Sequence, residues 1–456
     1  MSEDLVCISP VDGREYARRT LTPAVEVERV LERARSAQRA WRQVALADRS
    51  AALRRFMAAM EALNADIVPE LAWQMGRPVR YGGELRSLKE RVEAMLALAP
   101  EALADDFRAN GRVARVPAGL VLVIAPWNYP FLTAANTIVP ALLAGNAVIL
   151  KHSVQTLLAG ERFAEAFAAA GLPDGLFANL FLSHEQTGRL LGGGLVDHAT
   201  FTGSVEGGRA VERAAAGSFT TLTLELGGKD PAYVRSDADL GAAVEGLVDG
   251  SFFNAGQSCC GVERIYVHEA VWTPFLEGFV EGARAYRLGD PLDPETSLGP
   301  MASARGAAEV RRQVAAAVAA GARTHVPTQL FPADTGEGPY VMPQVLTGVD
   351  HKMALMREET FGPAIGIMPV SSDEEALALM NDSDFGLTAS IWTRDTAAAQ
   401  ALAARVEAGT VLVNRCDYLD PQLAWTGIKQ SGRGASLGGY GFEAVTRPKS
   451  LYLGSA

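Results

Sequence analysis

Cysteine is scarce in this 456-residue chain, and the placement of the few that occur argues against two common uses of the residue. Two of them are adjacent, which makes a poor disulfide framework, and none has the spacing of a metal-binding motif. They are Cys7, Cys259, Cys260 and Cys416. Any cysteine with a special role in this chain is therefore expected to act as a reactive thiol.

Long apolar runs and basic runs are lacking as well. No apolar stretch approaches the ~20 residues that cross a bilayer, and the start, MSEDLVCISP, lacks the basic beginning and apolar core of a secretory signal. We therefore expect a cytoplasmic protein without a membrane partner. A net charge of −11 and the lack of Lys/Arg clusters also argue against a nucleic-acid partner, because basic side chains that neutralise phosphates dominate such binding.

The length and the spacing of apolar residues predict an α/β protein of more than one domain. A single hydrophobic core stops growing at roughly 250 to 300 residues. Helical spacing over 27–41 and 53–63 makes the first ~100 residues mainly helical. From residue 112 onward, short apolar runs alternate with helical patterns, as in a doubly wound nucleotide-binding sheet. A second α/β stretch covers about 230–429, and the cleft between the two is the expected active site.

Three residues have the chemistry of a covalent mechanism. Cys259 follows a Gly-Gln-Ser turn and precedes a strand, a junction that can expose a thiol, although free cysteines are usually buried and inert. Glu225 lies in an apolar strand, where a desolvated carboxyl group is a better base unless it is a structural ion-pair partner. Asn128 lies between a strand and a proline that begins a helix, so its amide can donate a hydrogen bond into the cleft.

Five motifs in order resemble those of the aldehyde dehydrogenase superfamily. The C-terminal segment SGRGASLGGYGFEAVTRPKS is similar too, so the resemblance covers essentially the whole chain. It implies an NAD(P)-binding domain at 1–111 and 118–227, a catalytic domain at 228–430, and a bridging oligomerisation element at 112–117 and 431–456. The motifs are PWNYP at 126–130, FTGS at 201–204, LELGGK at 224–229, FFNAGQSC at 252–259 and EETFGP at 358–363.

The resemblance also implies a reaction. Cys259 attacks an aldehyde carbon, and the Asn128 amide with the backbone N–H of Cys259 holds the oxyanion. A hydride leaves for nicotinamide, and water deprotonated by Glu225 releases a carboxylic acid. Cys260 is expected to pack and not to react. The positions that correspond to NAD or NADP contacts are Trp127, Lys151, Gly203, Ser204, Gly208, Leu226, Glu359 and Phe361.

Four residues depart from the pattern of many relatives. Val154 stands where a glutamate would repel a 2′-phosphate, so NADP is not excluded and the preference stays open. Thr137 and Ser436 replace the lysine and glutamate of a proton relay, so protons are expected to leave Glu225 through water or backbone groups. Asn136 replaces an arginine that relatives acting on succinate semialdehyde often use, so a small dicarboxylic semialdehyde is not favoured.

The positions that correspond to the family's substrate tunnel mix aromatic and polar side chains. This mixture suits a neutral aliphatic or aromatic aldehyde, although Arg415 nearby could bind a distant carboxylate. No metal is implied. The tunnel positions are Tyr129, Thr133, Asn136, Asp417, Tyr418, Leu419 and Trp425.

The strands expected at 112–117 and 449–453 need partners along their edges. The resemblance implies that they pair between subunits, in a homodimer or homotetramer. Two alternative functions remain. An acylating enzyme that passes the thioester to coenzyme A is disfavoured by the hydrolytic base Glu225, and a catalytically silent binding or structural protein is disfavoured by the intact Asn128 and Cys259.

Overall fold

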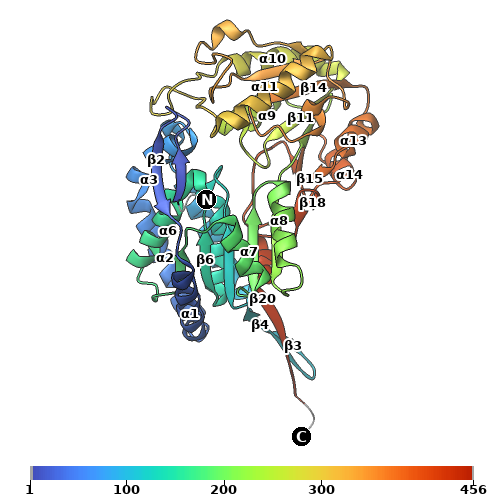
Figure 1. Cartoon of the computed structure of the whole chain (residues 1–456). Helices are drawn as coiled ribbons and strands as arrows, with labels where there is room; N and C mark the ends of the chain where they lie inside the picture. The colour runs from blue at the N-terminus through green and yellow to red at the C-terminus, as the bar shows by residue number, and fades with distance from the viewer. Residues whose placement is uncertain (1–3, 454–456) are drawn as a thin grey trace.

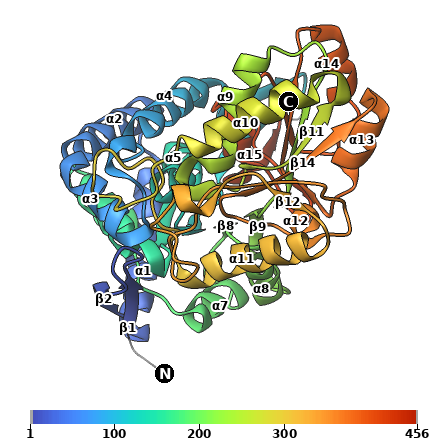
Figure 2. The same cartoon turned by 90° about the horizontal axis from the view of Figure 1, so that it is seen from above.

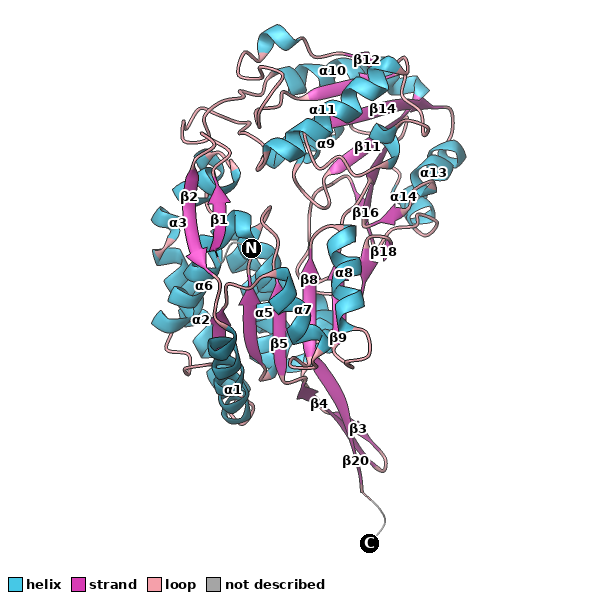
Figure 3. Ribbon diagram, in the orientation of Figure 1, coloured by secondary structure: helices cyan, strands magenta, loops and turns pink. Residues whose placement is uncertain are grey.

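The computed structural model describes residues 4–453, so 1–3 and 454–456, the outer ends of the first and last predicted segments, lie outside the described residues. The body has two lobes, each a β-sheet flanked by helices, and a narrow three-stranded sheet projects from it (Figures 1 and 3). Seen from above, α2, α3 and α4 lie on one side of the molecule and α13 and α14 on the other (Figure 2). The predicted α/β class is confirmed.

The first lobe contains a six-stranded sheet in the order β19-β9-β8-β5-β6-β7, parallel except for β19. The chain runs outward from β5 to β7 and then returns to β8 on the other side of β5, so the strand order reverses between β5 and β8. A crevice at such a reversal is where doubly wound sheets bind ligands. The strands are β5 (Leu120–Ile124), β6 (Ala147–Lys151), β7 (Phe177–Asn179), β8 (His198–Thr202), β9 (Thr221–Glu225) and β19 (Gly432–Arg433).

Helices cover both faces of this sheet, which explains why β5 and β6 are continuous buried apolar runs. The predicted helical start is found over 24–102, but the sequence reading missed a hairpin before it, β1 (Asp4–Ile8) and β2 (Glu15–Thr20). The helices are α1 (Ala24–Trp41), α2 (Leu46–Ala62), α3 (Asn64–Met75), α4 (Leu85–Ala102), α5 (Pro130–Ala144), α6 (Leu157–Ala169), α7 (His184–Gly192), α8 (Val205–Ala215) and α15 (Gly438–Ala444).

The second lobe is built on a seven-stranded sheet in the order β12-β13-β14-β11-β10-β16-β17. Its strands are β10 (Asp230–Val234), β11 (Val262–His268), β12 (Arg323–Thr324), β13 (Gln344–Thr347), β14 (Ala364–Val370), β16 (Thr388–Trp392) and β17 (Thr410–Val413). Its helices are α9 (Leu240–Phe252), α10 (Trp272–Arg284), α11 (Ala304–Ala319), α12 (Ala354–Arg357), α13 (Asp373–Asn381) and α14 (Thr396–Ala403). A small ladder joins β15 (Phe385–Gly386) to β18 (Ile428–Lys429).

The projecting sheet consists of β3 (Asp106–Arg108), β4 (Gly111–Pro117) and β20 (Thr446–Tyr452), in the order β20-β4-β3. Within 431–453, the described part of the predicted segment 431–456, only β20 belongs to this sheet, because β19 joins the first lobe and α15 packs against α4 and α5. The domain boundaries themselves stay a prediction.

No helix among residues 4–453 is long and apolar enough to cross a membrane. Short 3₁₀ helices are η1 (Val79–Tyr81), η2 (Val154–Thr156), η3 (Phe253–Gly256), η4 (Glu269–Val271) and η5 (Thr328–Leu330).

A buried ion pair in the loop between α3 and α4 joins the two lobes. The side chains of Arg77 and Glu84 are only 4% and 3% exposed. Arg77 also donates to the Asn128 carbonyl at 2.6 Å and to the Asn254 Oδ1 atom at 3.4 Å. The Glu84 carboxylate accepts the first free N–H groups of α5, those of residues 131 and 132, and Glu84 itself has a left-handed φ of 65°. The pair therefore compensates local backbone strain and orients the chain on both sides of the cleft.

Replacing Glu84 by glutamine should strongly destabilise the protein. The change leaves the buried Arg77 guanidinium without its counter-charge, and breaking a buried pair in this way costs about 3 to 5 kcal/mol. We expect the free energy of unfolding to fall by about that amount, measured by urea titration and calorimetry. Glu93→Gln, at an exposed position of α4, is the matched control and should change it by less than about 0.5 kcal/mol. Equal stabilities of the two variants would contradict the role of the pair.

Candidate active site

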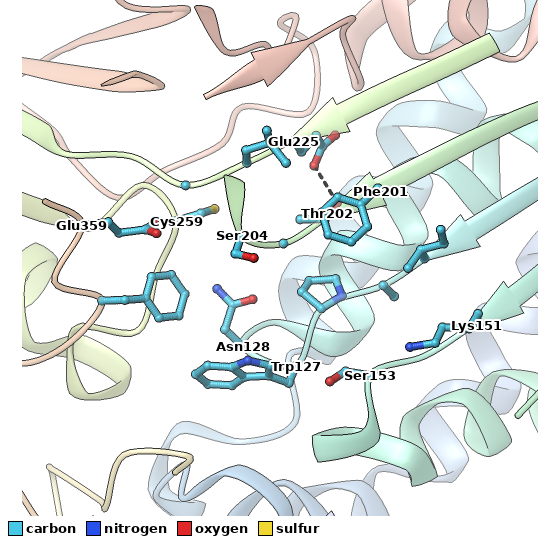
Figure 4. Close-up of a pocket in the computed structure, with 17 residues that line it drawn as sticks. Trp127, Asn128, Lys151, Ser153, Phe201, Thr202, Ser204, Glu225, Cys259 and Glu359 are labelled. Atoms are coloured by element: carbon cyan, nitrogen blue, oxygen red, sulfur yellow. Dashed lines mark hydrogen bonds between the residues drawn. The ribbon is translucent and has the colours of Figure 1, made fainter. Parts of the chain in front are cut away.

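A cavity of about 410 Å³ opens at the carboxyl ends of β5, β6, β8 and β9, at the reversal of strand order (Figure 4). The first lobe supplies the residues that follow these strands, and Cys259, Glu359 and Phe361 close the cavity from the second lobe. Most of the predicted cofactor positions are in its wall. They are Trp127, Lys151, Gly203, Ser204, Leu226, Glu359 and Phe361.

Cys259 lies on the loop between η3 and β11, and it is partly exposed. Three successive residues before it have left-handed backbone, with φ values of 53° at Asn254, 57° at Ala255 and 68° at Gly256. A Cβ atom on Gly256 would collide with the backbone carbonyl of Gly362, so glycine is needed here. Left-handed geometry at non-glycine residues is strained and persists only where the surroundings hold it. The strained loop is what brings the thiol to the cavity.

Asn128 follows β5 and is buried opposite the Cys259 loop (Figure 4). Its carbonyl accepts from Arg77, and the Asn254 amide donates to the same oxygen at 3.3 Å. The Asn128 Nδ2 atom donates to the Gln257 carbonyl at 3.2 Å. The backbone of Asn128 is thus held from both lobes, while its side-chain amide points toward the segment that carries the thiol.

Glu225 ends β9 and is buried between two hydroxyl groups. Thr202, its register partner on β8, donates to the carboxylate at 3.3 Å, and the Ser436 hydroxyl donates to the other oxygen. Burial raises the pKa of Glu225 above its ordinary value, although these hydrogen bonds and the Arg91 charge oppose the shift. Release of protons from Glu225 through water or backbone groups stays a prediction. The structure adds that the Ser436 hydroxyl, at the position of the missing relay glutamate, donates to Glu225.

The side chains at the predicted cofactor positions have different surroundings. Lys151 is buried, and burial lowers its pKa. The rings of Trp127 and Phe361 meet edge to face with centroids 5.6 Å apart. Ser204 caps α8 by accepting from the Gly207 N–H at 3.2 Å.

Gly208 and Val154, two other positions singled out for the cofactor, do not form part of the cavity wall. Gly208 is buried in α8, where a Cβ atom would collide with the Leu226 side chain, so its visible role is close packing. Val154 begins η2 beside Ser153, which does line the cavity. Ser153 was not among the cofactor positions that we predicted from the sequence.

Glu359 is a half-buried residue whose Oε1 atom accepts from the Gly228 N–H at 3.1 Å. Burial and the nearby Glu263 raise the pKa of Glu359 to about 8. Gly227 and Gly228 allow this close approach, because a Cβ atom on Gly227 would overlap the Glu359 carboxylate. A Cβ atom on Gly228 would lie 2.9 Å from the Cys259 carbonyl.

A second cavity, of about 240 Å³, lies on the other side of Cys259 and Glu225, and these two residues line both cavities. The structure brings every predicted tunnel position into its wall, namely Tyr129, Thr133, Asn136, Asp417, Tyr418, Leu419 and Trp425. Arg415 is not in the wall, and its guanidinium instead lies 3.3 Å from the centre of the Tyr418 ring.

The second cavity also contains charged residues that the sequence reading missed: Arg91, Glu90 and Asp249. Asp417 accepts hydrogen bonds from Ser258 at 2.6 Å and from Cys260 at 3.1 Å, and burial raises the pKa of Asp417. A hydrogen bond with Cys259 and burial raise the pKa of Cys260 well above its ordinary value, which favours its neutral thiol. Within the described part of the chain, no group of three or more His, Cys, Asp or Glu residues could hold a metal ion.

The known proteins that are similar to this chain include several aldehyde dehydrogenases. The model of the aldehyde dehydrogenase family matches residues 1–451. The chain is 33% identical to a succinate semialdehyde dehydrogenase [NAD(P)+] of Escherichia coli (98% of this chain, 97% of the relative) and 35% identical to a betaine aldehyde dehydrogenase of Cereibacter sphaeroides (98% and 93%). The structure of succinic semialdehyde dehydrogenase from Streptococcus pyogenes with NADP+ superimposes with a TM-score of 0.93 at 28% identity (99% and 100%). The chain belongs to the aldehyde dehydrogenase family.

Proposed function

We propose that the chain catalyses the NAD(P)-dependent oxidation of an aldehyde to a carboxylic acid, with Cys259 as nucleophile and Glu225 as general base. The observation that carries the proposal is the position of these two residues at the boundary between the two cavities. An aldehyde in the smaller cavity and a nicotinamide ring in the larger one would meet at the thiol. Cys259 is also the partly exposed cysteine at this boundary, while its neighbour Cys260 is buried.

In the first half of the reaction the Cys259 thiolate adds to the aldehyde carbon, and the carbonyl π electrons move onto oxygen. The Asn128 amide, after leaving the Gln257 carbonyl, donates to this oxyanion. A nicotinamide cofactor held by the residues of the larger cavity would supply the hydride acceptor for the same carbon. The oxyanion then reforms its carbonyl group, so the enzyme carries a thioester on Cys259.

In the second half Glu225 removes a proton from water, which attacks the thioester carbon and expels the Cys259 thiolate. The raised pKa of Glu225 makes it a better proton acceptor than an exposed glutamate. The Thr202 and Ser436 hydroxyls orient the Glu225 carboxylate before the substrate binds. This hydrolytic step would distinguish the chain from an enzyme that transfers the acyl group to coenzyme A.

Several groups support binding of a dinucleotide in the larger cavity. The cavity lies where doubly wound sheets bind such ligands, beside the first turn of α8. Lys151 can meet a ribose or a 2′-phosphate, and Val154 carries no charge that would repel the phosphate. We infer that the chain uses NADP as well as NAD.

We also infer that the chain forms a homodimer or homotetramer through the projecting sheet. Most of β20 is exposed, and large apolar side chains of the same sheet lie in solvent. The exposed fraction is 73% for Phe107 and 74% for Tyr452. Unpaired strand edges with exposed apolar groups are stabilised by pairing with another chain.

Cys259→Ser should lower turnover by roughly a thousandfold or more, because a hydroxyl is a much weaker nucleophile than a thiolate at neutral pH. Formation of reduced nicotinamide, followed by absorbance with a panel of aldehydes and both cofactors, measures the effect. Cys260→Ser is the matched control and should keep turnover within about tenfold of wild type. An active Cys259→Ser enzyme would remove this thiol from the mechanism. A wild-type protein that reduces neither cofactor would contradict the proposed function.

Glu225→Gln should separate the two halves of the reaction, since glutamine keeps the size of the side chain but cannot accept a proton. Rapid mixing with aldehyde and cofactor should give up to one equivalent of reduced nicotinamide per site and then very slow turnover. Mass spectrometry of the quenched protein should find the acyl group on the peptide that contains Cys259. Turnover like that of wild type would argue against the role, and so would loss of the burst while both ligands still bind.

Affinity for NAD+ should rise with pH up to about 8 and then level off. Below its raised pKa, Glu359 is protonated in the free protein, whereas the carboxylate is the better acceptor for ribose hydroxyl groups. Binding that requires loss of one proton strengthens by up to about tenfold per pH unit below the pKa. Fluorescence titration between pH 6 and 9 measures this slope, and NAD+ avoids the 2′-phosphate, which titrates in the same range. Glu359→Gln should be nearly flat, and equal slopes in the two proteins would contradict the assignment.

A further inference from the structure

Arg91 is a buried cation in the wall of the smaller cavity. It lies on α4, is 9% exposed, and donates through Nη1 to the Asn136 Oδ1 atom at 2.7 Å and to the Leu132 carbonyl at 3.2 Å. Over residues 4–453, no carboxylate forms an ion pair with Arg91, and its Nε and Nη2 atoms donate to no acceptor. Burial lowers the pKa of Arg91, and the nearby carboxyl groups of Glu84 and Glu225 oppose that shift. A guanidinium keeps its proton in proteins, so Arg91 reaches the cavity as a cation with unused donors.

Asn136, on α5, adds a second unused donor at the same place. The side chain is 2% exposed, its oxygen is taken by Arg91, and its Nδ2 atom has no hydrogen-bond partner among the described residues. A buried amide N–H without an acceptor costs about 1 to 3 kcal/mol, and a buried charge without a partner costs more. Both costs fall away when a ligand brings acceptor atoms and a negative charge.

We propose that Arg91 and Asn136 bind a carboxylate at the end of the substrate remote from its aldehyde group, so that the preferred substrates are aldehydes bearing a second, anionic terminus. The inference rests on the proposed oxidation of aldehydes and names its substrate class. A carboxylate offers two oxygens to the planar guanidinium, which binds such groups with good geometry. The expectation that Asn136 disfavours a dicarboxylic semialdehyde is therefore revised, because the cation comes from another helix that packs against α5.

The same cavity contains four carboxyl groups, and their surroundings differ from those of Arg91. Asp417 already accepts two hydrogen bonds, and burial raises its pKa. Asp249 is exposed to solvent. Glu90 is exposed to solvent. Glu225 is the catalytic base, and it is held by its own hydroxyl donors. The buried side chains of the cavity that keep unused hydrogen-bonding groups, Arg91 and Asn136, are thus donors, which favours an anionic ligand over a cationic one.

Three four-carbon aldehydes test the inference: succinic semialdehyde, butanal and 4-aminobutanal, which end in a carboxylate, a methyl group and an ammonium group. In wild type, kcat/KM should be at least about tenfold higher for succinic semialdehyde than for butanal. In Arg91→Met this ratio should fall by about tenfold to a hundredfold, mainly through KM for the semialdehyde, and Arg91→Lys should restore part of it. Arg86→Met, at an exposed position of the same helix, is the control and should keep the wild-type ratio.

A binding measurement on the wild-type protein makes the test independent of variants and of turnover. With the cofactor present, succinate should bind at least about tenfold more tightly than butyrate by calorimetric titration, because only succinate has a second carboxylate for Arg91. Equal binding, a ratio that Arg91→Met leaves unchanged, or preference for 4-aminobutanal would overturn the inference, the last by assigning the cavity to a cation. Failure of every aldehyde to reduce the cofactor would contradict the proposed function instead, and the succinate titration would still decide the anion site.

Discussion

The buried ion pair of Arg77 and Glu84 is the interaction on which the geometry of this active site depends. Neither side chain can be lost alone, because the other would then be an uncompensated charge in the interior. Arg77 holds the backbone of Asn128 and also contacts Asn254 in the strained loop before Cys259. Glu84 holds the first turn of α5, which follows Asn128. One charge pair outside the reaction thus positions both the amide and the thiol loop that would take part in it.

Removal of water explains most of the chemical character of the two cavities. Burial raises the pKa of Glu225 and Glu359 and lowers that of Lys151, since the charged form of each group loses hydration. The same physical effect makes Arg91 and Asn136 costly while their donors lack acceptors. Burial would therefore underlie both the basicity of Glu225 and the proposed anion selectivity of Arg91 and Asn136. A bound carboxylate would satisfy the donors of Arg91 and Asn136, while Glu225 would stay buried.

Many residues around the cavities could be predicted because the motifs at 126–130, 201–204 and 224–229 lie where strands of one parallel sheet end, and such strands end at a common edge. The motifs at 252–259 and 358–363 belong to the second lobe, so their place in the site was predicted from the family resemblance alone. The prediction was weaker where a residue acts through packing or through distant segments. Gly208 matches a cofactor motif, but its visible role is to admit the Leu226 side chain. Ser436 reaches Glu225 near the place where β19 pairs with β9, a pairing between segments about 200 residues apart that no local pattern reveals.

The sequence by itself determined the α/β class, the family, and the candidates for nucleophile and base, because strand and helix periodicities are local and the motifs are contiguous. Only the tertiary structure decided which side chains complete each cavity and which remain without partners. The sequence alone indicated that Asn136 replaces an anion-binding arginine. In the fold, packing of α4 against α5 places another arginine, Arg91, in hydrogen-bond contact with Asn136. The reason is physical: burial and hydrogen-bond satisfaction depend on long-range packing, which a motif does not encode.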